Sequence, residues 1–299
     1  LHKELDRFTD ATRRAATAYR IGDLLERHKP DQQDKAILAY KQALELLPGY
    51  RPALRGLSRA LGTQGNYEQL VEIFKGELEA AQSREDRIQI LLRIADLQEH
   101  ELHDDDEALK SYEQLVVLDP KLPAALQGRR RILSRKKQWS TLAVALRAEA
   151  EITDAPWRRV KLLYDAGALL EEPLGLVDEA LATYQEVLER QPDYLPALMS
   201  AGRILAARND HAGLLALHQR ELAASENAAH RTWLLVKIGR ILDEHLGKPQ
   251  AAIAAYRQAL DQNVSTATAA DLLLDLYERC DMHAEWADLK SRQKEADIK

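Results

Sequence analysis

The sequence predicts an all-helical repeat protein, and three observations support this fold class. Ala, Leu, Arg, Glu and Gln are abundant, whereas the 299 residues include only two Phe and two Met. That mixture favours helix over sheet. One set of residues recurs every 72 positions. All ten prolines fall where a helix is expected to start or stop, as the lost amide and the ring clash require. We therefore expect helices joined by short turns and no sheet.

The repeat is defined by an alanine, a tyrosine, an aliphatic residue, a proline and a final alanine–leucine pair at fixed offsets. These residues are Ala36, Tyr40, Leu44, Pro48 and Ala53–Leu54; Ala108, Tyr112, Val116, Pro120 and Ala125–Leu126; and Ala180, Tyr184, Leu188, Pro192 and Ala197–Leu198. Ala252, Tyr256 and Leu260 begin a fourth copy. Agreement at so many positions is very unlikely to arise by accident, so the period determines the architecture.

The last copy is expected to differ in length. Trp286 and Leu289 lie three residues later than the positions that hold Trp139 and Leu142 in an earlier copy. This shift predicts a three-residue insertion between Leu260 and Leu273.

Each 72-residue unit has about the length of two helical hairpins, which gives eight hairpins in all. Within each predicted helix the apolar residues are three and four positions apart. Ser83, followed three residues later by Asp86, indicates a helix start. The predicted helix pairs are 9–28/32–46, 51–63/66–81, 84–101/105–118, 123–135/138–152, 156–172/176–190, 195–207/210–224, 227–246/248–262 and 267–280/283–297.

These hairpins resemble tetratricopeptide repeats, in which a first helix, A, precedes a second helix, B. The A-helix pattern of that family is similar to Leu198, Ala201, Gly202 and Leu205, and its B-helix pattern is similar to Ala180, Tyr184 and Pro192. The resemblance implies one right-handed superhelical solenoid of about eight hairpins over residues 1–299. Some hairpins depart from the family pattern, with Leu70, Leu142, Leu214 and Leu289 in place of Ala, and Arg130 and Tyr277 where Gly202 suggests a small residue.

The resemblance also implies where a partner would bind. In the family the A helices line the concave groove, and the residue after the small position points into it. Those residues are Asp23, Arg59, Asp96, Arg131, Ala168, Arg203 and Arg240. The arginines could grip carboxylates or phosphates through their guanidinium groups. Alternatively, Asp23 and Asp96 pair with Arg59 and Arg131 as a solvated charge ladder.

A basic segment precedes Trp139. It contains Arg129, Arg130, Arg131, Arg135, Lys136 and Lys137. It could bind a phosphate backbone, an acidic peptide or lipid headgroups, with the Trp139 ring as a stacking platform. Alternatively, the segment is a solvated face and Trp139 packs at the start of a B helix.

The overall charge and apolar pattern restrict partner and location. Lys plus Arg number 42 against 48 Asp plus Glu, and the net charge of −6 argues against a general nucleic-acid or membrane-surface binder. No apolar run is long enough to span a bilayer, and residues 1–10 lack the features of a secretion signal. Because the chain begins at Leu1, we interpret it as part of a longer protein. Its richness in Ala, Leu and Arg suggests a bacterial source. We expect a cytoplasmic location, or a periplasmic one if a signal was removed.

The sequence contains no recognisable catalytic motif. It lacks a nucleophile constellation, a glycine-rich phosphate loop, a Cys-x-x-Cys pair and a His-Glu-x-x-His motif. His100 and His103 precede four acidic residues, 104–107, but acids at a helix start also complement its dipole. His211 and His218 share a helix face, as histidines at a repeat interface would. We expect no metal, cofactor or small-molecule substrate.

The expected function is a protein–protein interaction scaffold or adaptor that binds a partner peptide or domain in its concave groove. Two alternatives stay open. The chain could be a regulatory or sensor module of a larger enzyme or signalling protein. Less favoured is nucleic-acid binding through residues 129–137.

Overall fold

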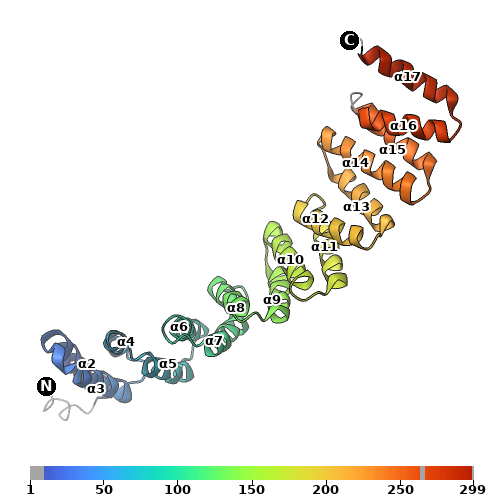
Figure 1. Ribbon diagram of the computed structural model, residues 1–299. Coiled ribbons are helices and arrows are strands. Elements are labelled where there is room, and N and C mark those ends of the chain that lie inside the picture. Colours follow the sequence, from blue (N-terminus) through green and yellow to red (C-terminus); the bar gives the residue numbers. More distant parts are fainter. Residues whose placement is uncertain (1–9, 263–266, 298–299) are drawn as a thin grey trace. The chain divides into compact units, whose positions relative to one another are not determined.

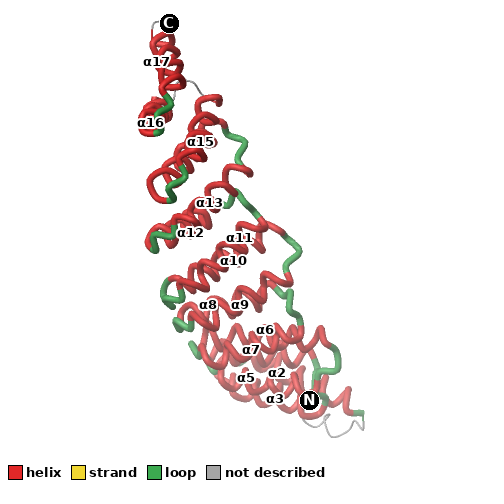
Figure 2. The backbone as a smooth tube through the Cα atoms, turned by 90° about the vertical axis from the view of Figure 1, so that its right-hand side faces the viewer, coloured by secondary structure: helices red, strands yellow, loops and turns green. Residues whose placement is uncertain are grey.

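The computed structural model describes residues 10–262 and 267–297. Helices account for 84% of the structure, and the described residues form sixteen α-helices and no strand (Figure 1). Short loops join successive helices throughout this part of the chain (Figure 2). The predicted all-helical fold class is therefore confirmed. Helices begin and end within two residues of the predicted positions when the π-helical turns that follow Asp96 and Arg240 are counted with their helices.

The chain forms two compact units, Leu1–Gln138 and Trp139–Lys299. We call the first helix of each predicted hairpin its A helix and the second its B helix. Unit 1 contains α2 (Ala11–His28), a 3-10 turn η1 (Pro30–Gln32), α3 (Gln33–Leu46), α4 (Arg51–Gln64), α5 (Tyr67–Ala80), α6 (Arg84–Asp96) with a π-helical turn η2 (Leu97–Glu101), α7 (Asp105–Leu118) and α8 (Pro123–Arg135). Its A helices are α2, α4, α6 and α8.

Unit 2 begins with the B helix α9 and continues with four hairpins. Its elements are α9 (Trp139–Ile152), α10 (Pro156–Glu171), α11 (Val177–Arg190), α12 (Leu195–Ala207), α13 (His211–Ala224), α14 (Ala228–Arg240) with a π-helical turn η3 (Ile241–His245), α15 (Pro249–Gln262), α16 (Ala267–Arg279) and α17 (His283–Asp297). Its A helices are α10, α12, α14 and α16.

Tyrosines at the 72-residue spacing fill the core of successive repeats. Tyr40, Tyr112, Tyr184 and Tyr256 are all buried. Each lies on a B helix, and glycines on the A helices give its ring room. A Cβ atom added at Gly22 of α2 or Gly56 of α4 would collide with the ring of Tyr40. The equivalent environments of the tyrosines confirm the repeat that the sequence predicts.

The predicted three-residue insertion in the last copy is wrong. Helix α16 begins 72 residues after α12, and α17 begins 72 residues after α13. The buried residues Ala269 and Ala270 occupy the positions of Ala197 and Leu198. The sequence match was misleading because Trp286 and Leu289 lie three residues further along α17 than Trp139 and Leu142 lie along α9.

In the helices α4, α8 and α12, the position that requires a small residue also differs from the prediction. Gly56 and Gly128 face the rings of Tyr40 and Tyr112 and have no room for a Cβ atom. At Gly202, an added Cβ would make only an ordinary contact, 3.6 Å from a Leu217 methyl group. The small residue is thus needed two positions earlier in the repeat. Arg130 and Tyr277 do not disturb the packing, although they depart from the family pattern at the sequence level.

Candidate functional site

Three of the predicted groove arginines donate hydrogen bonds to a glutamate on the preceding A helix. The pairs are Arg59 with Glu26 at 2.6 and 2.7 Å, Arg131 with Glu99 at 2.6 and 2.5 Å, and Arg203 with Glu171 at 2.5 Å. The planar guanidinium group suits such paired bonds to a carboxylate. These arginines therefore hold neighbouring A helices together.

The same glutamates accept a hydrogen bond from the buried tyrosines. Tyr40 donates to Glu26 at 2.7 Å, Tyr112 donates to Glu99 at 2.9 Å, and Tyr184 donates to Glu171 at 2.9 Å. We call each set of three residues a clip: Tyr40–Glu26–Arg59, Tyr112–Glu99–Arg131 and Tyr184–Glu171–Arg203. A clip joins a B helix, its own A helix and the A helix of the next hairpin.

Burial and hydrogen bonding oppose each other at the clip carboxylates. The Glu99 side chain is fully buried, and burial alone would raise its pKa. Hydrogen bonds from Arg131 and Tyr112 outweigh that effect and lower the pKa of Glu99 to about 2. The bond from Arg59 likewise lowers the pKa of Glu26. Glu99 and Glu26 are therefore charged at neutral pH. Burial and the neighbouring carboxylate raise the pKa of Tyr40 and of Tyr112.

The last repeat keeps the ion pair with a shifted arginine. Arg279 on α16 donates to Asp243 in η3 at 2.5 Å. Asp275 occupies the position of Arg203, while Arg279 lies one helical turn further on, at the position of Arg135. Arg135 itself reaches Glu99 at 2.9 Å, so both helix positions give access to the same carboxylate.

The observed ion pairs have different acidic partners from those of the predicted charge ladder. Asp23 pairs with Arg27 at 3.1 Å, and Asp96 lies 3.6 Å from His100. The partners of Arg59 and Arg131 are instead the glutamates three residues further along each A helix. One helical turn separates the two positions, and only the later one also reaches the tyrosine hydroxyl.

Arg240, the remaining predicted groove arginine, is exposed at the end of α14. No carboxylate of the described residues forms an ion pair with it. Arg240 therefore differs from Arg131 and Arg203, whose guanidinium groups are bonded to carboxylates of the protein.

The predicted basic patch does not form a set of free cations. Arg135 pairs with Asp105 at 2.8 Å as well as with Glu99, and Lys136 pairs with Asp106. Arg129 and Arg130 are partly buried in α8, and Lys137 follows the helix in a left-handed conformation (φ 54°). Arg135 and Lys136 are therefore paired with acidic residues of the preceding hairpin.

Sequence reasoning missed a second series of glutamates, at positions 77, 149 and 221. Glu149 accepts from Arg158 at 2.7 Å, and Glu221 accepts from His230 at 2.8 Å. Each bond joins a B helix to the A helix that follows it. Glu77 differs, because its buried Oε1 accepts no hydrogen bond from the described residues. Burial raises the pKa of Glu77 to about 7, although Arg93 partly opposes this. The 72-residue spacing was the signal that could have identified the series.

The histidines take structural positions. The His211 ring stacks on that of His245, with centroids 3.8 Å apart, and His218 lies 3.5 Å from Glu221. Near His100 and His103, the side chain of Asp104 caps α7 by accepting the Glu107 amide at 3.0 Å. Within the described ranges, no group of three or more His, Cys, Asp or Glu could hold a metal ion.

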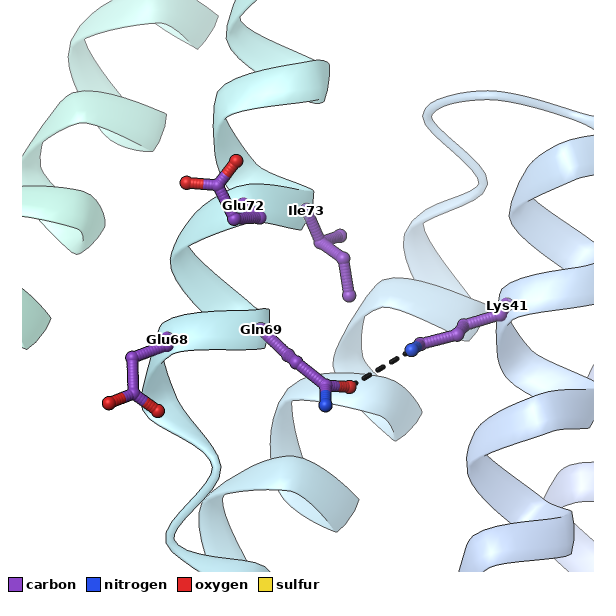
Figure 3. Close-up of a pocket in the computed structure, with 5 residues that line it drawn as sticks. All are labelled: Lys41, Glu68, Gln69, Glu72 and Ile73. Carbon is purple, nitrogen blue, oxygen red and sulfur yellow. Dashed lines mark hydrogen bonds between the residues drawn. The ribbon is translucent and has the colours of Figure 1, made fainter.

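A small open hollow lies between the B helices α3 and α5. It is lined by Lys41, Glu68, Gln69, Glu72 and Ile73 (Figure 3). Lys41 donates to Gln69 Oε1 at 3.0 Å, while Glu68 points away from this bond in the close-up.

Exposed apolar side chains on the A helices of unit 2 were not singled out from the sequence. Trp157 lies on α10, Leu195 and Met199 lie on α12, and Trp233 lies on α14. The corresponding faces of α4 and α8 in unit 1 carry polar residues such as Arg55 and Gln127. In the part of the chain that the structure covers, no helix is long and apolar enough to cross a membrane.

Comparison with known proteins gives family matches in unit 2. Residues 161–194 and 234–263 each match a family model for the tetratricopeptide repeat. A comparison with curated proteins gives no match.

Several solved structures share low identity with this chain. A tetratricopeptide repeat protein from Parabacteroides merdae is 18% identical, covering 87% of this chain and 98% of its own, with a TM-score of 0.35. YrrB, a TPR protein with an unusual peptide-binding site, is 16% identical (68% and 98% covered, TM-score 0.34). The TPR2AB domain of yeast Sti1, in complex with pHSP90, is 15% identical (89% and 98% covered, TM-score 0.33).

The matched segments coincide with the hairpins that the structure shows. Residues 161–194 cover most of α10 and α11, and residues 234–263 cover α15 and much of α14. Helices with the same bounds and the same buried tyrosine recur 72 residues apart on either side. Two hairpins of this helical array, residues 161–194 and 234–263, are thus tetratricopeptide repeats by their match to the family models.

Proposed function

We propose that this chain is a scaffold that binds a partner peptide or domain along its A-helix face. Tetratricopeptide repeats in general form non-catalytic scaffolds for protein–protein interaction. Within each unit, the A helices form the face that binds the partner.

The observation that carries the proposal is that some A-helix side chains bond within the protein and others do not. The clip residues hold the repeats together internally, whereas Lys237 and Arg240 on α14 have no ion-pair partner among the described residues. Their charge is therefore available to a partner. Nucleic-acid binding through residues 129–137 is less favoured, since Arg131, Arg135 and Lys136 already pair with carboxylates.

The test compares charge reversals on the two helix types. The chain is used to capture proteins from its source organism, and the affinity of each captured partner is then measured directly. Arg240→Glu should weaken binding, and Glu189→Lys, on the exposed side of the B helix α11, should leave it unchanged. Arg131 and Arg203 are poor probes because their reversal also breaks a clip. A partner that is lost with Glu189→Lys and kept with Arg240→Glu would place binding on the B helices.

A further inference from the structure

Three large apolar side chains of unit 2 are exposed on neighbouring A helices. Leu195 and Met199 on α12 are 59% and 67% exposed, and Trp233 on α14 is 49% exposed. Single exposed apolar residues are common, but a grouped set marks a surface that another molecule covers.

The repeat itself indicates that these side chains lie together. In unit 1 the ion pair Arg51–Asp86, at 3.4 Å, joins the starts of α4 and α6. Leu195 and His230 occupy the equivalent positions 144 residues later, at the starts of α12 and α14. The His230 ring stacks on Trp233, with centroids 5.6 Å apart and planes 13° apart. A polar contact in unit 1 is thus replaced by an apolar and aromatic surface in unit 2.

Cations border this surface on the same helix faces. The ammonium group of Lys237 lies over the Trp233 ring, 5.4 Å from its centroid, and Arg240 follows three residues later. Arg203 lies four residues after Met199 and eight after Leu195, on the same face of α12. Its side chain is 63% exposed although it is bonded to Glu171. The next A helix, α16, carries Asp271 and Asp275 on its exposed face, so the cationic stretch ends at α14.

We infer that this surface binds an acidic amphipathic peptide segment. Bulky apolar side chains of the segment cover Leu195, Met199 and Trp233, and its carboxylates pair with Lys237 and Arg240. The charge complementarity selects this occupant, because a basic segment would bring its cations against Lys237 and Arg240. The inference rests on the proposed scaffold function and names the partner chemistry and the helices that recognise it.

The experiment selects peptides directly on the full chain. A phage library of random peptides, each long enough for about four helical turns, is panned against the protein, and the selected peptides are synthesised. We expect them to combine bulky apolar residues with Asp and Glu. Their affinity is measured for the native chain, for Leu195→Ser with Met199→Ser, and for Lys237→Glu with Arg240→Glu. Each pair of changes should weaken binding by about tenfold or more.

Matched controls use apolar residues that are equally exposed on B helices. Leu38 on α3 and Val117 on α7 are 64% and 82% exposed, so Leu38→Ser and Val117→Ser should leave the affinity unchanged. Circular dichroism checks that every variant keeps its helix content. Selected peptides that bind the Leu195/Met199 variant at full strength would refute this surface and leave the scaffold function standing. Peptides enriched in Lys and Arg, or a selection that yields none, would refute the stated partner chemistry.

Discussion

Tyr184 combines packing and hydrogen bonding in one side chain. It is 1% exposed, and its hydroxyl donates to Glu171 at 2.9 Å. Tyr184→Ala should lower the free energy of unfolding by about 3 kcal/mol, because it leaves a cavity. Tyr184→Phe keeps the ring and should cost only about 1 kcal/mol. Urea unfolding followed by circular dichroism measures both, and equal losses for the two variants would show that the ring contributes little.

The buried carboxyl group of Glu77 should make the stability of the protein depend on pH. Burial raises its pKa to about 7, above the value in the unfolded chain. The protonated form is therefore favoured by folding, and this contribution to stability is lost as the pH rises through about 7. Glu77→Gln should stabilise the protein by about 1 kcal/mol near pH 8 and have almost no effect near pH 4.5. Glu79→Gln, on the exposed side of α5, serves as the control. A gain that is the same at both pH values would exclude this explanation.

At the scale of helices, the clip at Glu99 should show the opposite pH dependence. Its pKa is lowered to about 2, so the ionised form stabilises the junction of η2, α7 and α8. That contribution is complete above the unfolded-chain pKa and disappears as the pH falls through about 2. Glu99→Gln should cost about 2 kcal/mol near pH 6, and the cost should shrink towards pH 2. Chemical unfolding across this range tests it, with the exposed Glu113→Gln as the control. A constant cost at every pH would contradict the role of the charge.

Helix positions followed from the sequence, whereas helix contacts followed only in part. Prolines and the 72-residue period determine where helices start, since both act locally. The pairing of Arg59 with Glu26 rather than Asp23 depends on which turn of α2 faces α4 and on the Tyr40 hydroxyl. Such a choice depends on the rotation of one helix against another, which spacing alone does not specify.

At the scale of the whole molecule, stability should vary along the array. A helix with few buried side chains is held less firmly by its neighbours than one with many. Helix α17 packs on α16, and residues 283–293 of it include no fully buried side chain. Hydrogen exchange followed by mass spectrometry should show α17 exchanging first and α11 much later. Uniform protection along the chain would mean that the array unfolds only as a whole.

The binding surface illustrates what the repeat conceals. Matching the copies emphasised positions that agree, such as the clip arginines. Leu195, Met199 and Trp233 stand out because the residues 144 positions earlier, in unit 1, are polar or charged. Those residues are Arg51, Arg55 and Gln89. Positions that differ between copies do not serve the common packing, so they are where a specific partner can be recognised.

The clips also have a mechanical consequence. Each one crosses from one hairpin to the next within a 72-residue copy, as Tyr112, Glu99 and Arg131 do. When force is applied to the two ends of the chain, both hairpins of a copy should rupture as one event. In an optical trap the tether would then lengthen in steps of about 25 nm, the contour of one copy at about 3.5 Å per residue. Arg131→Gln should split one of these steps into two shorter ones. The clips would thus set the size of the elastic element in this protein.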